Sequence, residues 1–251
     1  MNQKTAETPG TAQTAGRLYL VATPIGNLED ITLRAIRILK ECGLIACEDT
    51  RRTRILLDHY GIKNETVSYH SYSDNSKTGF LIRSMLEGKS IAYVTDGGTP
   101  GISDPGEILV RDAVKNRITV ESVPGPSALV SALVCSGLPA NGFIFLGFLQ
   151  RKPGKIKKAL KKAAESGKTI VFYESPFRVV KTVGLCAGIF REGTQCVIAR
   201  EITKKFEEYI RGTLAEVYAE ISSRKEIKGE IVVMVGPEEG GDGRANEKGG
   251  E

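Results

Sequence analysis

The chain has 251 residues, of which 41% are hydrophobic and 26% charged, and its formal net charge is +5. This composition is ordinary for a globular protein, and the length suffices for one large domain or two smaller ones. No apolar stretch approaches the roughly 18 residues that a membrane span needs, and residues 1–16 lack the features of a signal peptide. We therefore expect a cytoplasmic protein with disordered tails at 1–16 and 237–251.

Apolar, strand-like runs alternate with helix-like segments, which predicts an α/β fold with largely parallel sheets. The first half is expected to contain strands at 18–22, 44–47, 66–69, 91–95 and 119–123 and helices at 30–40, 51–60, 77–86, 107–115 and 126–134. Asp30 is the expected N-cap of the first helix.

A turn from Gly137 to Gly142 marks the expected boundary between two α/β domains, 17–142 and 143–236. The second domain is expected to contain strands at 143–148, 169–173, 195–199, 206–211 and 230–235, with helices within 151–168 and at 177–189 and 214–222.

The cysteine pattern argues against a disulfide framework or a metal site. The number of cysteines is odd, no two have Cys-x-x-Cys spacing, and the chain has two histidines, His59 and His70. We interpret the cysteines as small core residues of a protein in a reducing compartment. They are Cys42, Cys47, Cys135, Cys186 and Cys196.

The most informative loop follows the strand expected at 91–95. Glycine and proline make up half of residues 95–106. Glycine costs conformational entropy, so such a cluster indicates that the backbone closely approaches another group. Loops at 23–28, 124–128 and 172–178 also follow expected strands, and the carboxyl ends of strands in an open sheet converge on a ligand crevice.

Spacing excludes the common phosphate-binding motifs. The tripeptides Gly88-Lys-Ser90 and Gly167-Lys-Thr169 lack the earlier glycine of a P-loop, and each precedes a strand instead of a helix. The first strand is followed by Thr-Pro-Ile-Gly-Asn-Leu, which is not a dinucleotide fingerprint, and no Gly-x-Ser-x-Gly elbow occurs. The loops of the first half carry little positive charge and suit a neutral or cationic ligand.

Positive charge is concentrated between residues 151 and 168. Eight lysines and arginines accompany one acidic residue, Glu165, so this window carries +7 and the rest of the chain −2. The pattern indicates an anionic partner such as nucleic acid, although a solvated lysine-rich helix face produces it too.

Several motifs together resemble a known family. Residues 18–32 read Leu-Tyr-Leu-Val-Ala-Thr-Pro-Ile-Gly-Asn-Leu-Glu-Asp-Ile-Thr, which is similar to the opening of tetrapyrrole methylase-like (class III) methyltransferases, more narrowly the bacterial small-subunit ribosomal RNA methyltransferase I group. The motifs that follow in the same order are Cys-Glu-Asp-Thr-Arg-Arg-Thr at 47–53, the loop 95–106, Ser-Val-Pro-Gly-Pro-Ser at 122–127, Phe-Leu-Gly-Phe at 145–148, Tyr-Glu-Ser-Pro-Phe-Arg at 173–178 and Ala-Arg-Glu at 199–201. The resemblance covers residues 17–236, and Gln150 departs from it where proline is expected.

The resemblance implies two α/β domains of tetrapyrrole methylase type with S-adenosylmethionine bound in a cleft between them. It implies 2′-O-methylation of a cytidine ribose in the decoding region of 16S rRNA, hence the small ribosomal subunit as partner, no membrane attachment, and a homodimer. The residues that it assigns to the cofactor are Pro24, Ile25, Asp96, Gly98, Thr99, Ile102, Ser127, Ala128, Tyr173, Ala199 and Gly229.

Methylation of a ribose hydroxyl requires alignment with the methyl–sulfur bond and a group that accepts the hydroxyl proton. Candidate acceptors, which the sequence does not rank, are Glu48, Asp49, Asp104, Glu174, Glu201 and Lys204. Asp104 is equally suited to cap its helix, and Glu48 to orient Arg51. The residues expected to bind RNA are Arg51, Arg52, Arg54, Lys152, Lys157, Lys158 and Lys161.

Two other interpretations stay open at this point. In the first, the same fold and cofactor serve a small tetrapyrrole, against which the lysine-rich segment and the Thr-Pro-Ile-Gly-Asn junction argue. In the second, the chain is a non-enzymatic RNA-binding or ribosome-assembly module, against which the glycine-rich loops argue.

Overall fold

The computed structural model describes residues 15–70 and 75–238. The disordered tails expected at 1–16 and 237–251 therefore lie almost entirely outside the described residues. At their inner ends, Gly16 donates a backbone hydrogen bond to Met85 at 2.7 Å, and Glu238 accepts one from the N–H of Arg191 at 2.8 Å.

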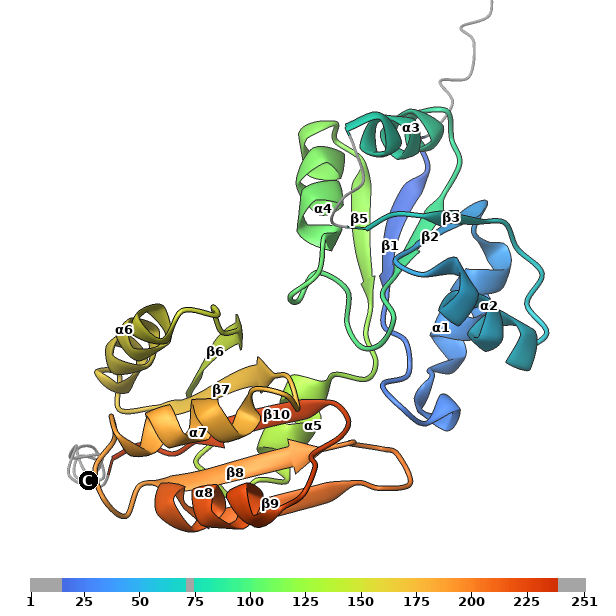
Figure 1. Ribbon diagram of the computed structural model, residues 1–251. Coiled ribbons are helices and arrows are strands. Elements are labelled where there is room, and N and C mark those ends of the chain that lie inside the picture. The colour runs from blue at the N-terminus through green and yellow to red at the C-terminus, as the bar shows by residue number, and fades with distance from the viewer. Residues whose placement is uncertain (1–14, 71–74, 239–251) are drawn as a thin grey trace, which may run out of the picture. The chain divides into compact units, whose positions relative to one another are not determined.

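The chain divides into two compact units (Figure 1). Among the described residues, unit 1 contains those up to Pro24 together with Asp30–Gly125, and unit 2 contains Ile25–Glu29 and those from Pro126 onward. The sequence places the boundary near residue 142. The structure differs because the helix that follows Pro126 packs on the sheet of unit 2.

Unit 1 is built on a five-stranded parallel sheet in the order β3-β2-β4-β1-β5. Its strands are β1 (Arg17–Val21), β2 (Leu44–Cys47), β3 (Thr66–Ser68), β4 (Ile91–Val94) and β5 (Thr119–Val123). Strands β2 and β4 are apolar and buried at every position, as is typical of strands covered on both faces. The parallel arrangement predicted from the sequence is present in this unit.

The helices of unit 1 lie on both sides of this sheet (Figure 1). They are α1 (Leu33–Glu41), α2 (Thr50–His59), α3 (Asn75–Leu86) and α4 (Gly106–Lys115). The prediction of Asp30 as the N-cap of the first helix is wrong, because Asp30 ends a 3₁₀ turn, Leu28–Asp30. Thr32 caps α1 instead, with its hydroxyl accepting the N–H of Ala35 at 3.1 Å.

Unit 2 is built on a five-stranded sheet in the order β6-β7-β10-β8-β9. Its strands are β6 (Phe143–Phe148), β7 (Thr169–Glu174), β8 (Gln195–Arg200), β9 (Glu208–Thr213) and β10 (Ile231–Val235). Strands β6 and β7 are parallel, whereas the three remaining pairs are antiparallel. The prediction of a largely parallel sheet is therefore wrong for this unit. The connection from β8 to β9 has no crossover helix and so joins antiparallel neighbours.

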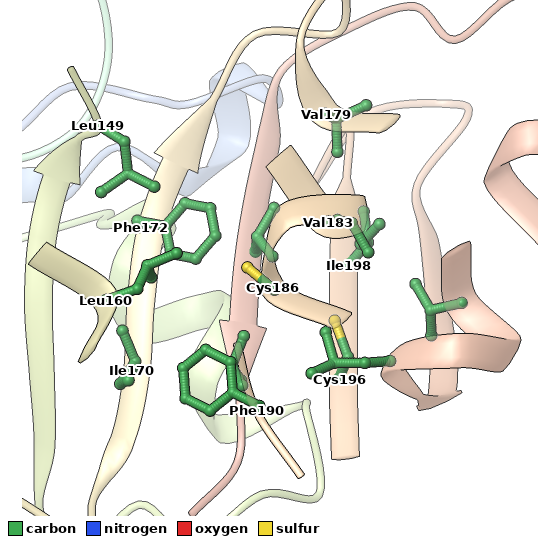
Figure 2. Close-up of a cluster of buried hydrophobic side chains, with 14 of the residues drawn as sticks. Leu149, Leu160, Ile170, Phe172, Val179, Val183, Cys186, Phe190, Cys196 and Ile198 are labelled. Atoms are coloured by element: carbon green, nitrogen blue, oxygen red, sulfur yellow. The ribbon is translucent and has the colours of Figure 1, made fainter. Parts of the chain in front are cut away.

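Helices cover both faces of the second sheet. They are α5 (Ala128–Val134), α6 (Pro153–Ala164), α7 (Val179–Ala187) and α8 (Leu214–Ser223). Helices α6, α7 and α8 pack with Phe172 in the core shown in Figure 2, and α5 packs against Val171 and Val197 on the opposite face. Adjacent strand residues thus face different cores, as the two-residue repeat of a strand requires. No helix in the described part of the chain is long and apolar enough to cross a membrane.

The cysteines are free thiols, and four of the five are buried. Cys135 differs from the expectation of a core residue because it is exposed at the end of the short helix α5.

A five-residue segment from the amino-terminal part of the chain, Ile25–Glu29, belongs to unit 2. Ile25 packs against the apolar cluster beside α5. The N–H of Asn27 donates to Oγ1 of Thr203, in the β8–β9 connection, at 3.1 Å. Gly26 lies so close to this connection that a Cβ there would overlap the side chain of Lys204.

We expect Gly26→Ala to lower the free energy of unfolding by about 1–3 kcal/mol, because the added methyl group would overlap Lys204 and lie 2.8 Å from Oγ1 of Thr203. Gly154→Ala, in the same unit, is the matched control. A Cβ at Gly154 has nothing within 4 Å, and alanine favours the helix that contains this position, so this change should raise the free energy of unfolding by up to about 1 kcal/mol. Urea denaturation followed by circular dichroism measures both variants. Equal midpoints would contradict the close packing of this segment.

Candidate functional site

The carboxyl ends of β1 and β4 are joined at one edge of the parallel sheet in unit 1. Thr23 and Gly98 exchange two backbone hydrogen bonds, of 3.0 and 2.9 Å, and Oγ1 of Thr23 donates to the carbonyl of Thr95 at 3.2 Å. Gly98 has a φ of 90°, which glycine adopts without the strain that a Cβ would add. The glycine-rich loop at 95–106 is thereby attached to the end of β1.

Asp104 shapes the second half of this loop. Its carboxylate accepts the N–H of Gly101 at 2.6 Å and the N–H of Gly106, in the first turn of α4, at 2.8 Å. The hydroxyl of the buried Tyr93 donates to the same carboxylate at 3.3 Å. Both oxygens of Asp104 are therefore engaged in holding the loop and the start of α4, although Pro105 occupies the N-cap position itself.

Acidic side chains gather where β2 and β4 end. Oε2 of Glu48 accepts the N–H of Asp96 at 3.1 Å, and Oδ1 of Asp96 accepts the N–H of Asp49 at 3.2 Å. Burial, together with the nearby charges of Asp96 and Asp104, raises the pKa of Glu48. Among the candidate acceptors, Glu48 is a carboxylate whose surroundings favour the protonated form.

Asp49, rather than Glu48, orients Arg51. Its carboxylate accepts the backbone N–H of Arg51 at 2.8 Å, which caps α2, and lies 3.0 Å from Nη2 of the same residue. The side-chain hydrogen bonds from Arg51 lower the pKa of Asp49 to about 2. Arg52 in turn lies 3.4 Å from Oδ2 of Asp96.

Glu174 is a buried structural carboxylate. Its side chain is 1% exposed, and it accepts the hydroxyl of Thr182 at 2.7 Å and lies 3.2 Å from Nη2 of Arg178. Arg178, which was not among the residues singled out from the sequence, also donates to the carbonyls of Leu149 and Gln150 at 3.1 and 3.2 Å. This pair therefore fastens the β7–α7 connection to the residues that follow β6.

Glu201 and Lys204 form an ion pair of 2.9 Å in the β8–β9 connection, and Lys204 also lies 3.1 Å from Glu230. Although burial opposes it, the N–H of Glu230 and the ammonium of Lys204 lower the pKa of Glu201. Burial likewise opposes a rise in the pKa of Lys204, but the two carboxylates raise it. The lowered pKa makes Glu201 a weak base, and Lys204 already carries its proton, so neither is suited to accept one.

The residues that the resemblance assigns to a cofactor form one set in each unit. In unit 1 they follow β1 and β4 and are Pro24, Asp96, Gly98, Thr99 and Ile102. In unit 2 four of them belong to the apolar cluster on the α5 face of the sheet, and these are Ile25, Ala128, Tyr173 and Ala199. Ser127 is the N-cap of α5 but makes no side-chain capping bond. At Gly229, a Cβ would overlap Glu201.

The expected RNA-binding residues also fall into two groups. Arg51, Arg52 and Arg54 are exposed on α2 in unit 1. In unit 2, Lys157, Lys158 and Lys161 are exposed on α6, and Lys152 is exposed as its N-cap. The other face of α6 contributes Leu160 to the core, as Figure 2 shows.

Residues 17–218 match the family model described as Tetrapyrrole (Corrin/Porphyrin) Methylases. The ribosomal RNA small subunit methyltransferase I of Hydrogenobaculum sp. is 47% identical over 223 residues, which cover 88% of this chain and 96% of that protein. The protein of the same name from Mesorhizobium japonicum is 45% identical over 222 residues, which cover 88% of this chain and 76% of that protein.

Solved structures share the fold at low sequence identity. Uroporphyrin III C-methyltransferase from Thermus thermophilus is similar with a TM-score of 0.62 and 22% identity, over 87% of this chain and 97% of that one. A diphthine synthase is similar with a TM-score of 0.69 and 12% identity, over 88% and 90%. At these identities the likeness shows the fold alone.

The raised pKa of Glu48 means that its charged form opposes folding near neutral pH. Glu48→Gln removes this charge and keeps an oxygen for the N–H of Asp96. We therefore expect the variant to have a higher free energy of unfolding than the wild type at about pH 8. The gain should shrink as the pH falls and vanish below 4.5, the ordinary pKa, where Glu48 is protonated in both the folded and the unfolded chain. Urea denaturation at several pH values measures this.

Glu192→Gln, at an exposed position of unit 2, is the control for a change of net charge and should alter stability little at any pH. A gain for Glu48→Gln that does not depend on pH would contradict the expectation.

Proposed function

Because the chain belongs to the tetrapyrrole methylase family, we propose that it transfers a methyl group from S-adenosylmethionine to the ribosomal RNA of the small subunit. The observation that carries the proposal is the identity of 45–47% to proteins named ribosomal RNA small subunit methyltransferase I, over 88% of this chain. The finer proposal, which follows from the resemblance, is that the acceptor is the 2′ oxygen of a cytidine ribose in the decoding region of 16S rRNA. A homodimer is a further expectation from the resemblance.

S-adenosylmethionine supplies a methyl group bonded to a sulfonium cation, and the residues of unit 1 suit such a ligand. The loop at 95–106 contains no lysine or arginine and offers backbone groups at its glycines. Asp96 and Glu48 lie at its start, so the local charge favours a cation over a polyphosphate. We propose that this set and the corresponding set of unit 2 both contact the cofactor.

We propose that Glu48 accepts the proton of the ribose hydroxyl. The hydroxyl becomes a competent nucleophile as its proton leaves, and the proton would pass to a carboxylate oxygen of Glu48. The ribose oxygen would form a bond to the methyl carbon as the methyl–sulfur bond breaks, and neutral S-adenosylhomocysteine would leave.

The remaining candidates are less suited. Asp104 is engaged on both oxygens, Glu174 is buried, and Glu201 and Lys204 form an ion pair. Asp49 is paired with Arg51, which lowers its pKa to about 2. The raised pKa of Glu48 brings it closer to that of an effective base at neutral pH.

Charge supports RNA as the acceptor in preference to a small tetrapyrrole. The window 151–168 carries +7, and its lysines on α6 point away from the core. A polyanion that releases counterions gains affinity from many such contacts at once. A tetrapyrrole is a compact ring, so its carboxylates do not require a charged surface along a whole helix.

Transfer of tritiated methyl groups tests the proposal, with undermethylated small ribosomal subunits as acceptor. We expect label in ribosomal RNA at a phosphodiester that resists alkali, because methylation removes the 2′ hydroxyl that attacks the phosphate. Glu48→Gln should reduce the rate by about a hundredfold or more at saturating S-adenosylmethionine, while calorimetry shows that the variant still binds the cofactor.

Free ribosomal RNA and uroporphyrinogen are the parallel acceptors. Label in uroporphyrinogen and none in RNA would replace the proposal with the tetrapyrrole alternative. Failure to bind S-adenosylmethionine would instead favour the non-enzymatic RNA-binding module.

The basic face of α6 generates a separate prediction. Changing Lys157, Lys158 and Lys161 together to alanine should weaken RNA binding and flatten its dependence on salt, by about 0.7–0.9 in logarithmic slope for each phosphate that the variant no longer neutralises. Fluorescence anisotropy with labelled RNA at several salt concentrations measures both quantities.

The matched control changes three exposed lysines outside α6 by the same charge: Lys40, Lys63 and Lys225. An α6 variant with the wild-type slope would show that this face is only solvated.

A further inference from the structure

Two phenylalanines project into solvent at the edge of unit 2 where β6 and β7 end. Phe148, the last residue of β6, is 63% exposed, and Phe177, in the β7–α7 connection, is 93% exposed. Burial of a phenyl ring stabilises a folded protein, and these two exposed rings do not contribute that stability. The exposure of Phe148 is not caused by a chain that has left the fold. Leu149, the next residue, is buried in the core with Phe172 (Figure 2).

Both phenylalanines are attached to fixed parts of the sheet. Phe148 is the register partner of Tyr173, and the two ring centroids lie 5.4 Å apart. Arg178, which directly follows Phe177, donates to the carbonyl of Leu149 at 3.1 Å. The end of β6 and the β7–α7 connection, which carry the two exposed rings, are thus joined by a side-chain hydrogen bond.

The residues that follow Phe148 in the chain are basic and polar. Residues 149–164 contain seven lysines and arginines and no acidic residue. Gln150 and Arg151, directly beyond Leu149, are exposed as well. A surface that binds an apolar protein partner usually has a continuous apolar patch. Separate aromatic rings close to cationic side chains in the sequence are instead typical of a surface that binds nucleic acid, in which bases stack on the rings and phosphates pair with the cations.

We propose that Phe177 and Phe148 are stacking surfaces for unpaired bases of an RNA strand whose phosphates are held by the basic residues of 151–162. A phenyl ring offers its face to any base, so the contact tolerates different sequences and requires that the base be unpaired. This inference rests on the proposed function and deepens it. It proposes that unit 2 recognises a single-stranded segment of the RNA substrate.

Fluorescence anisotropy of the full chain with a labelled single-stranded RNA of about a dozen nucleotides tests the inference. We expect Phe177→Ala and Phe177→Leu each to raise the Kd about tenfold, and Phe177→Trp to bind within about twofold of the wild type. Leucine keeps the apolar volume but has no aromatic face, so it separates stacking from general apolar contact. The salt dependence should be unchanged because no charge is removed.

Phe143→Ala is the matched control, since Phe143 begins the same strand at its other end and is 38% exposed. It should bind RNA as the wild type does. A duplex of the same sequence offers no unpaired base, so Phe177→Ala should not weaken its binding. Unchanged binding of S-adenosylmethionine by calorimetry shows that each variant is folded.

Wild-type affinity of Phe177→Ala or Phe177→Leu for the single strand would overturn the inference, and so would an equal loss of affinity for the duplex. If the wild type methylates small subunits while either of these results holds, the proposed function stands and the stacking role fails. A chain that neither binds RNA nor methylates subunits would overturn both.

Discussion

The two backbone hydrogen bonds between Thr23 and Gly98 are the constraint on which the candidate site of unit 1 depends. They join the end of β1 to a loop after β4 that is rich in glycine and proline and has few side chains of its own to fix its shape. Each bond contributes on the order of 1 kcal/mol net, and leaving the groups unpaired and buried would cost more. With the loop attached at this point, Asp96 reaches the end of β2 and Asp104 reaches Tyr93. The positions of Glu48 and the other acidic groups follow from that attachment.

Much of unit 1 could be predicted from the sequence because its elements are local. Strands β2 and β5 have the expected bounds, since each is a short run bounded by turn residues or glycine. The direction of the strands in unit 2 could not be predicted in this way. Strand β10 is the last in the chain yet lies between β7 and β8, and its apolar run has the same pattern whichever way it pairs. Asp30 and Thr32 are both good capping residues, and Thr32 serves because Asp30 is the last residue of a 3₁₀ turn.

In the candidate site, the types of the functional residues could be predicted from the sequence, but their environments could not. Glu174 and Glu201 each lie at the end of a buried strand, so the sequence pattern around them predicts the same role for both. Their environments differ because Glu174 is enclosed by Thr182 and Arg178, whereas Glu201 is paired with Lys204 and bonded to the N–H of Glu230. A partner 29 residues away leaves no local signal. Arg178 could have been noticed only as a basic residue in a motif otherwise read for its tyrosine and glutamate.

The placement of Ile25–Glu29 has a consequence for how the chain folds during synthesis. Neither unit is a single continuous stretch, because this segment of unit 2 is made before nearly all of unit 1. Its partners beside α5 and at Thr203 are synthesised only after residue 125. The segment therefore has no partner to pack against while the residues before and after it form the parallel sheet of unit 1. Vectorial synthesis would then complete unit 1 first and close unit 2 last. A fragment that begins at Pro126 contains every strand of the second sheet and still lacks one piece of its core.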